Sequence, residues 1–141
     1  MISQLAVATL MVLLTVAIHG GGLAFLERLL RLEARDEAIH HVPPLSQRTL
    51  SFTLALVLAL FVLHGMEIWS YAALYLWLGS IGDLETAVYF STFTYGGIGF
   101  GDSYMLPSWR LVSAIEGVNG VLLLGWSTAF FVTVVTRLGG R

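Results

Sequence analysis

Three long runs of apolar residues, separated by shorter polar stretches, organise the chain. They cover residues 2–25, 49–78 and 108–138. An α-helix of roughly 20 residues crosses the hydrocarbon core of a bilayer, because each residue adds about 1.5 Å along the helix axis. Each run exceeds that length, so the pattern predicts three transmembrane helices.

The segment between the first two runs has a different pattern. Residues 27–48 interleave charged side chains with leucine, isoleucine and valine at roughly helical spacing. An amphipathic helix of this kind is typical of the membrane interface. We therefore expect three parts, namely an N-terminal transmembrane helix at 1–26, a cytoplasmic amphipathic linker at 27–48 and a domain at 49–138.

A short helix and a glycine-rich stretch lie between the second and third runs. Asp83 is a candidate N-cap for a helix over residues 84–95, which is too short to span a membrane and is therefore expected to be re-entrant. Irregular backbone is tolerated at membrane depth only where protein buries it or where it lines a water-filled path. Such backbone is expected in the stretch that follows, which contains Gly96, Gly97, Gly99 and Gly101.

This stretch resembles a known motif. Gly97-Ile98-Gly99-Phe100-Gly101-Asp102 is similar to the selectivity filter of the potassium-channel pore family, whose usual pattern is TVGYGD. The resemblance covers roughly residues 50–138. It extends to the family's aromatic pore-helix segment at Tyr89-Phe90-Ser91, the start of its inner helix at Arg110-Leu111-Val112, and a frequent hinge glycine at Gly120.

The resemblance implies a fold and an assembly. The fold is an all-α membrane protein with three transmembrane helices, a re-entrant pore helix and a selectivity-filter loop. One loop cannot surround an ion, so four copies of the chain would build the pore as a homotetramer. The expected elements are an outer helix at 49–78, a pore helix at 84–95, a filter at 97–101 and an inner helix at 108–138.

Such a filter replaces the hydration shell of an ion with backbone carbonyl groups. Gly99 and Gly101 can take positive φ at low cost, which turns the backbone as a filter requires. No organic cofactor is expected, because K⁺ itself is the bound and permeant species. The resemblance implies that K⁺ is bound by the carbonyl groups of Gly97, Ile98, Gly99 and Phe100.

Three residues in and around the filter matter to its stability and selectivity. Tyr89 is expected to brace the filter by donating a hydrogen bond to Asp102, and the alternative is that Asp102 is an exposed turn residue. The family carries threonine at the position of Gly97, and glycine keeps its carbonyl but loses its hydroxyl. A weakly selective monovalent cation channel on the same fold therefore remains an alternative.

The last apolar run carries a stripe of residues at four-residue spacing. The resemblance directs this stripe toward the cavity of the pore, where Leu124 and Val132 would form a hydrophobic gate. The alternative is a surface for helix packing. The stripe consists of Gly120, Leu124, Thr128, Val132 and Thr136.

Four polar residues interrupt the second and third apolar runs at comparable depths. Ionisable groups inside a membrane are costly and are therefore candidates for a functional role. We expect a polar cluster behind the filter that either titrates and controls gating or joins the helices by hydrogen bonds. Its members would be His64, Glu67, Glu116 and Asn119.

Composition supports a membrane protein and argues against other classes. The chain is 57% hydrophobic and 11% charged, with a mean hydropathy of +0.82. It has no cysteine, no recognisable catalytic motif and no basic patch for nucleic acid, so neither an enzyme nor a nucleic-acid-binding protein is expected. A non-conducting membrane subunit that keeps the pore fold is a further alternative.

Arginine is distributed unevenly between the two sides of the expected membrane. By the positive-inside rule, the side with more arginine is cytoplasmic. We therefore expect a plasma (inner) membrane protein in contact with lipid, with its N-terminus and filter mouth outside and its C-terminus inside. Arg110 falls on the outer side, and the inner side carries Arg28, Arg31, Arg35, Arg48, Arg137 and Arg141.

Overall fold

The fold is all-α. The computed structural model describes residues 1–40, 47–99, 101 and 105–139, and this part of the chain contains no strand. The elements in chain order are α1 (Ile2–His40), α2 (Gln47–Trp77), α3 (Leu84–Tyr95), the 3₁₀ helix η1 (Pro107–Trp109) and α4 (Arg110–Gly139).

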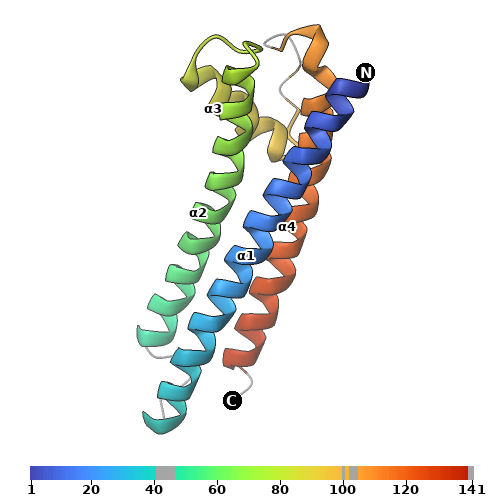
Figure 1. The fold of residues 1–141 in the computed structure, drawn as a ribbon. Coiled ribbons are helices and arrows are strands. Elements are labelled where there is room, and N and C mark those ends of the chain that lie inside the picture. The colour runs from blue at the N-terminus through green and yellow to red at the C-terminus, as the bar shows by residue number, and fades with distance from the viewer. Residues whose placement is uncertain (41–46, 100, 102–104, 140–141) are drawn as a thin grey trace.

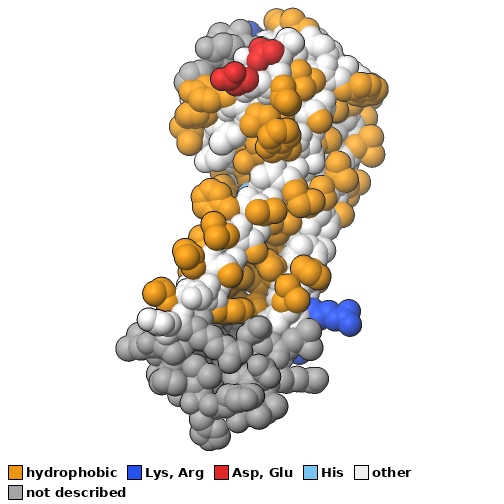
Figure 2. All heavy atoms as spheres, turned by 90° about the vertical axis from the view of Figure 1, so that its left-hand side faces the viewer, with side chains coloured by type: hydrophobic (Ala, Val, Ile, Leu, Met, Phe, Trp, Pro, Cys, Tyr) orange, Lys and Arg blue, Asp and Glu red, His pale blue; other side chains and the backbone are white. Residues whose placement is uncertain are grey.

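Three long helices run side by side, and the short helix α3 lies at one end of them (Figure 1). The N-terminus lies at the same end as α3, while the C-terminus lies at the other. Hydrophobic side chains cover much of the face shown in Figure 2. Within the described residues, three segments are long and apolar enough to cross a membrane, namely Ile2–Arg31, Leu50–Trp77 and Pro107–Thr136.

Helix α1 continues without a break past the predicted boundary at residues 26 and 27. It reaches His40, so the predicted division there is a change of polarity and not of backbone structure. The guanidinium of Arg31 lies 2.6 Å from the carboxylate of Glu27 on the exposed surface of this turn. Charged residues at this spacing support a helix, and no glycine or proline follows before His40 to end it.

The side chains of all four helices form a common core at the end that contains α3. Tyr71 and Tyr75 of α2 are fully buried there, with Phe90 of α3 and Val112 of α4 packed against the same cluster. Helix α1 contributes Ala8 and Met11 to this core. The N-terminal helix is therefore packed as part of the same body as the other three.

Helix α3 begins at the predicted N-cap. The carboxylate of Asp83 accepts a hydrogen bond from the backbone N–H of Thr86 at 2.9 Å. This bond satisfies one of the N–H groups that a helix leaves without a partner in its first turn. It also lowers the pKa of the Asp83 carboxyl below its ordinary value of 3.8.

Replacing Asp83 tests the contribution of this cap. Asp83→Ala should lower the thermal midpoint at pH 7, whereas Asp83→Asn should keep most of the stability because its amide oxygen still accepts. The folded pKa is depressed, so the advantage of the carboxylate is complete well above pH 3.8 and is lost progressively as pH falls below 3.8. Thermal unfolding of the three proteins at pH 7 and at acidic pH measures this, and equal midpoints at pH 7 would contradict it.

Candidate functional site

The end of α3 leads through a helix cap directly into the predicted filter, residues 97–101, which we call the filter segment. The N–H of Gly97 donates to the carbonyl of Thr94, and the N–H of Ile98 donates to the carbonyl of Phe93, both at 3.0 Å. This pair of bonds is a Schellman motif, in which the residue after the cap takes a left-handed conformation. Gly97 fills that position with φ of 70°. Gly97 therefore has a structural role of its own, because it ends α3.

Alternate residues of the filter segment take positive φ. The values are 70° at Gly97, 71° at Gly99 and 89° at Gly101, which confirms the expectation for the last two. L-residues with side chains rarely adopt such angles, so this backbone requires glycine. Two predicted residues of this region, Phe100 and Asp102, lie outside the described residues, and the expected contact of Asp102 with Tyr89 stays a prediction.

A groove of about 490 Å³ lies between the filter segment and α4. The glycines of the filter line one side of it, and Ser113 and Gly117 of α4 line another. The side chain of Ile98 is 68% exposed in the single chain. The filter segment is therefore incompletely covered by its own chain.

The stripe along α4 does not share one environment. Gly120 is buried, and a Cβ added there would overlap the carbonyl oxygen of Tyr95 at the end of α3. It packs against the end of α3, as the alternative of a helix-packing surface predicts, and its place along the cavity stays a prediction. Four-residue spacing turns by about 40° more than a full circle at each step, so the stripe rotates along the helix. Leu124 is half-buried, and Thr128, Val132 and Thr136 are exposed, so their predicted place along the pore stays open.

Glu116 of α4 is fully buried and joins two other helices. Its carboxylate accepts hydrogen bonds from the hydroxyl groups of Tyr75 on α2 and Ser91 on α3. Ser91 also lies 3.0 Å from the carbonyl oxygen of Ile68. This group holds the pore helix against the helices on both sides of it.

Asn119 makes a separate set of contacts one turn further along α4. Its amide nitrogen donates to the hydroxyl of Thr15 on α1 at 2.8 Å and to that of Tyr71 on α2 at 3.3 Å. Asn119 therefore links three helices without contacting the carboxylates.

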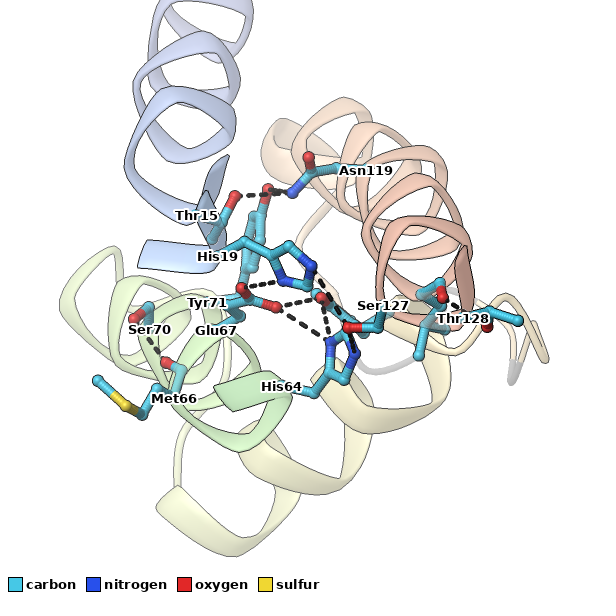
Figure 3. A network of polar contacts seen from close by, with 12 residues as sticks. Thr15, His19, His64, Met66, Glu67, Ser70, Tyr71, Asn119, Ser127 and Thr128 are labelled. Carbon is cyan, nitrogen blue, oxygen red and sulfur yellow. Dashed lines mark hydrogen bonds and ion pairs between the residues drawn. The ribbon is translucent and has the colours of Figure 1, made fainter. Parts of the chain in front are cut away.

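His64 and Glu67 lie together in a third group, which Figure 3 shows from close by. The Nδ1 of His64 lies 3.2 Å from Oε2 of Glu67, and the Nδ1 of His19 lies 2.9 Å from Oε1 of the same carboxylate. Tyr95 donates to Glu67, and Ser127 of α4 lies close to both imidazoles. We call these five residues the histidine cluster.

The four predicted polar residues therefore occupy three groups and not one. The prediction missed His19, which α1 brings against Glu67. A signal for it was present, because His19 is an ionisable residue inside an apolar run. Its partner could not be read from the sequence, since the two residues lie on different helices.

The sequence matches a known protein family. A sequence model described as an ion channel matches residues 49–137, which is more than half of the chain. The chain belongs to the ion-channel family. Comparison with curated proteins and with solved structures finds no match.

Membership of this family establishes the general class of the protein. The family is not a class of enzymes, and it includes the potassium-channel pore domain that the sequence resembles. With three apolar helices, the channel is an integral membrane protein. The whole of α1, including His19, precedes the matched region.

Removing the Glu116 carboxylate should destabilise the channel. In Glu116→Leu, Ser91 can still donate to the carbonyl of Ile68, but the buried hydroxyl of Tyr75 loses its acceptor. A buried unsatisfied hydroxyl costs about 1–3 kcal/mol. The thermal midpoint of the purified channel in detergent is the measurement.

A double variant separates this cause from a general packing defect. Tyr75→Phe combined with Glu116→Leu removes both partners, so the double variant should be more stable than Glu116→Leu alone. Ser70→Ala serves as a control, because among the described residues Ser70 bonds only the carbonyl of Met66 on its own helix and is half-buried at most. A double variant no more stable than Glu116→Leu would contradict this account.

Proposed function

We propose that four copies of the chain form a potassium channel. K⁺ would bind the carbonyl groups of Gly97, Ile98, Gly99 and Phe100 in place of its hydration shell. The observation that carries this proposal is the positive φ at Gly97, Gly99 and Gly101 in a member of the ion-channel family. A potassium filter is lined by backbone carbonyl groups, and a backbone that alternates in this way can turn successive carbonyl groups to one side.

Two features support assembly from several copies. Each chain carries one filter segment, so a ring of carbonyl groups needs more than one chain. The groove beside the filter and the exposed side chains of Val121, Leu122 and Trp126 provide a surface on α4 for neighbouring subunits. A homotetramer is the assembly that the resemblance to potassium channels implies.

We propose that the channel lies in the plasma (inner) membrane with its filter mouth outside. Arg28 and Arg31 lie toward the end of α1 that is remote from α3, and positive residues favour the cytoplasmic side. The exposed acids Asp83 and Glu85 lie at the start of α3. At an outer mouth they would raise the local concentration of cations.

Cation flux through the purified channel in liposomes tests the function. K⁺ and Na⁺ gradients are imposed separately, and barium is added as a blocker. A flux that prefers K⁺ and is blocked by barium is the expected result. An absence of flux over a range of pH would reject the proposal in favour of a non-conducting membrane subunit.

A weakly selective cation channel is the second candidate. One observation favours it, namely that Gly97 caps α3 and offers no hydroxyl at the base of the filter. Equal fluxes of K⁺ and Na⁺ in the same liposomes would support it. Gly97→Thr alone is a poor test, because the new Cβ would have positive φ and would lie 2.9 Å from Cγ2 of Val121. Gly97→Thr with Val121→Ala removes the second obstacle, and a rise in K⁺ preference would assign the weak selectivity to the missing hydroxyl.

A further inference from the structure

The histidine cluster gathers metal-ligating groups away from the filter. His19 comes from α1, while His64 and Glu67 come from one face of α2. His19 and Glu67 are fully buried, and the side chain of His64 is 12% exposed. We propose that these three residues form a binding site for one divalent transition-metal ion of the zinc class.

The spacing of the three side chains fits such an ion. The two Nδ1 atoms lie 2.9 Å and 3.2 Å from the two oxygens of the Glu67 carboxylate. One ligand atom from each of the three residues lies within 4.8 Å of the others. Ligands held 2.0–2.1 Å from a tetrahedral Zn²⁺ lie about 3.3 Å from one another. Small movements of these side chains would therefore bring all three around one ion.

The donor types also select this class of ion. Two imidazoles and one carboxylate are a common donor set for zinc, and imidazole suits transition metals better than it suits Mg²⁺ or Ca²⁺. A fourth ligand is available nearby, since the hydroxyl of Tyr95 lies 2.9 Å from Nδ1 of His64. The backbone carbonyl groups of the filter are a different kind of site, and the two need not bind the same ion.

The Nε2 atoms of both imidazoles lie close to the same side chain, that of Ser127. The Nε2 atoms of His64 and His19 lie 3.0 Å and 3.3 Å from Oγ of Ser127. A histidine that binds a metal usually donates its other N–H to an acceptor, which fixes its orientation. The Ser127 oxygen has two lone pairs and can accept from both rings when both Nδ1 atoms bind the ion.

A cation would balance the charge of the buried Glu67 carboxylate. With neutral rings, His64 can donate from Nε2 to Ser127 and accept at Nδ1 from Tyr95, but Tyr95 then no longer donates to Glu67. A metal ion at the two Nδ1 atoms leaves the Tyr95 hydrogen bond to Glu67 in place. The alternative source of positive charge is one added proton on an imidazole. A direct measurement of bound metal distinguishes the metal ion from the proton.

The position of the site gives metal binding a structural effect. The ion would link α1 to α2 directly beside Tyr95, which is the last residue of α3 and contacts Glu67. A ligand that binds the folded state alone stabilises it. Zn²⁺ should therefore raise the thermal midpoint of the channel whether or not the channel conducts.

Direct metal binding to the full chain tests the site. The chain contains four histidines, His19, His40, His41 and His64, so the protein is purified through a tag without histidine. Equilibrium dialysis in detergent measures bound Zn²⁺, and the visible absorption of added Co²⁺ reports a tetrahedral site. One ion per chain is expected in the wild type and in the control His40→Gln/His41→Gln.

The ligand variants should lose this binding. His19→Gln and Glu67→Gln should weaken Zn²⁺ binding by more than about 100-fold, and Ser127→Ala by roughly 10–100-fold because it removes only the acceptor behind the ligands. Either an absence of Zn²⁺ binding in the wild type or binding that is lost only in His40→Gln/His41→Gln would overturn the proposal.

A second measurement covers variants that fail to fold. The Co²⁺ spectrum of the wild type and of the conservative variant Ser127→Ala then decides, since a tetrahedral spectrum is expected in both and a hydrated octahedral spectrum would overturn the site. These readouts do not involve ion flux, so they stand apart from the test of the channel function.

Discussion

Gly120→Ala is expected to disrupt the packing of the pore helix against α4. The added Cβ would overlap the carbonyl oxygen of Tyr95 and would lie 2.8 Å from its carbonyl carbon and from Cγ of its ring. These are backbone and ring atoms, so no flexible side chain can move aside. Overpacking costs typically 1–3 kcal/mol, and a backbone contact puts the loss at about 3 kcal/mol or more. The thermal midpoint and the yield of monodisperse channel measure it.

Two other glycines give this prediction matched controls. A Cβ at Gly21 of α1 meets nothing within 4 Å, so Gly21→Ala should be neutral or slightly stabilising. A Cβ at Gly117 of α4 lies 3.2 Å from the carbonyl oxygen of Thr94, which is tight but not overlapping. The expected order of stability is therefore Gly21→Ala, then Gly117→Ala, then Gly120→Ala. Equal stability of Gly120→Ala and Gly21→Ala would show that α4 does not approach α3 in this way.

The pore helix could be predicted closely because local chemistry defines both of its ends. Asp83 caps its first turn through Thr86, and the Gly96-Gly97 pair closes its last turn. Its observed span, Leu84–Tyr95, agrees with the predicted residues 84–95. Caps of this kind depend on residues within a few positions of one another, so sequence alone specifies them.

The predicted boundary between residues 26 and 27 rests on polarity alone. The sequence changes from apolar to charged near residue 26, yet α1 continues to His40. A change from lipid to water around a helix does not by itself break the hydrogen bonds along its backbone. A boundary inferred from polarity marks where a membrane would end. It does not mark where a helix ends.

The polar residues show a second limit. Their depth along each helix follows from residue counting, but the direction each side chain points depends on how the helix is rotated within the bundle. Glu116 turns toward Ser91 and Tyr75, while Glu67 turns toward the histidines. That rotation is set by packing between helices distant in sequence, so His19 and Glu67 could not be paired in advance.

Tyr95 connects the histidine cluster to the predicted filter. Its hydroxyl donates to Glu67 of α2, its backbone carbonyl abuts Gly120 of α4, and the filter segment starts two residues later at Gly97. The base of the predicted filter is therefore held by contacts from two transmembrane helices.

Gly99→Ala is expected to abolish selective K⁺ flux while leaving the fold largely intact. Gly99 has φ of 71°, and a Cβ there meets nothing within 4 Å, so the penalty comes from the backbone and not from a clash. An L-residue in the left-handed region costs roughly 1–2 kcal/mol, and a tetramer would carry that cost four times around the ion. The backbone is then expected to leave this conformation and turn its carbonyl away. Liposome flux of K⁺ and Na⁺, normalised to folded protein, should fall at least tenfold or lose its K⁺ preference.

Gly79→Ala is the matched control for backbone strain. Gly79 has φ of 61°, and a Cβ there also meets nothing within 4 Å, but it lies in the turn between α2 and α3. Gly79→Ala should therefore lose similar stability per chain and keep its K⁺ flux and preference. If the two variants reduced flux equally, the effect would come from strain in general and not from the filter. If Gly99→Ala conducted K⁺ as selectively as the wild type, the left-handed conformation of Gly99 would not be needed for ion binding, and the proposed role of the filter backbone would fail.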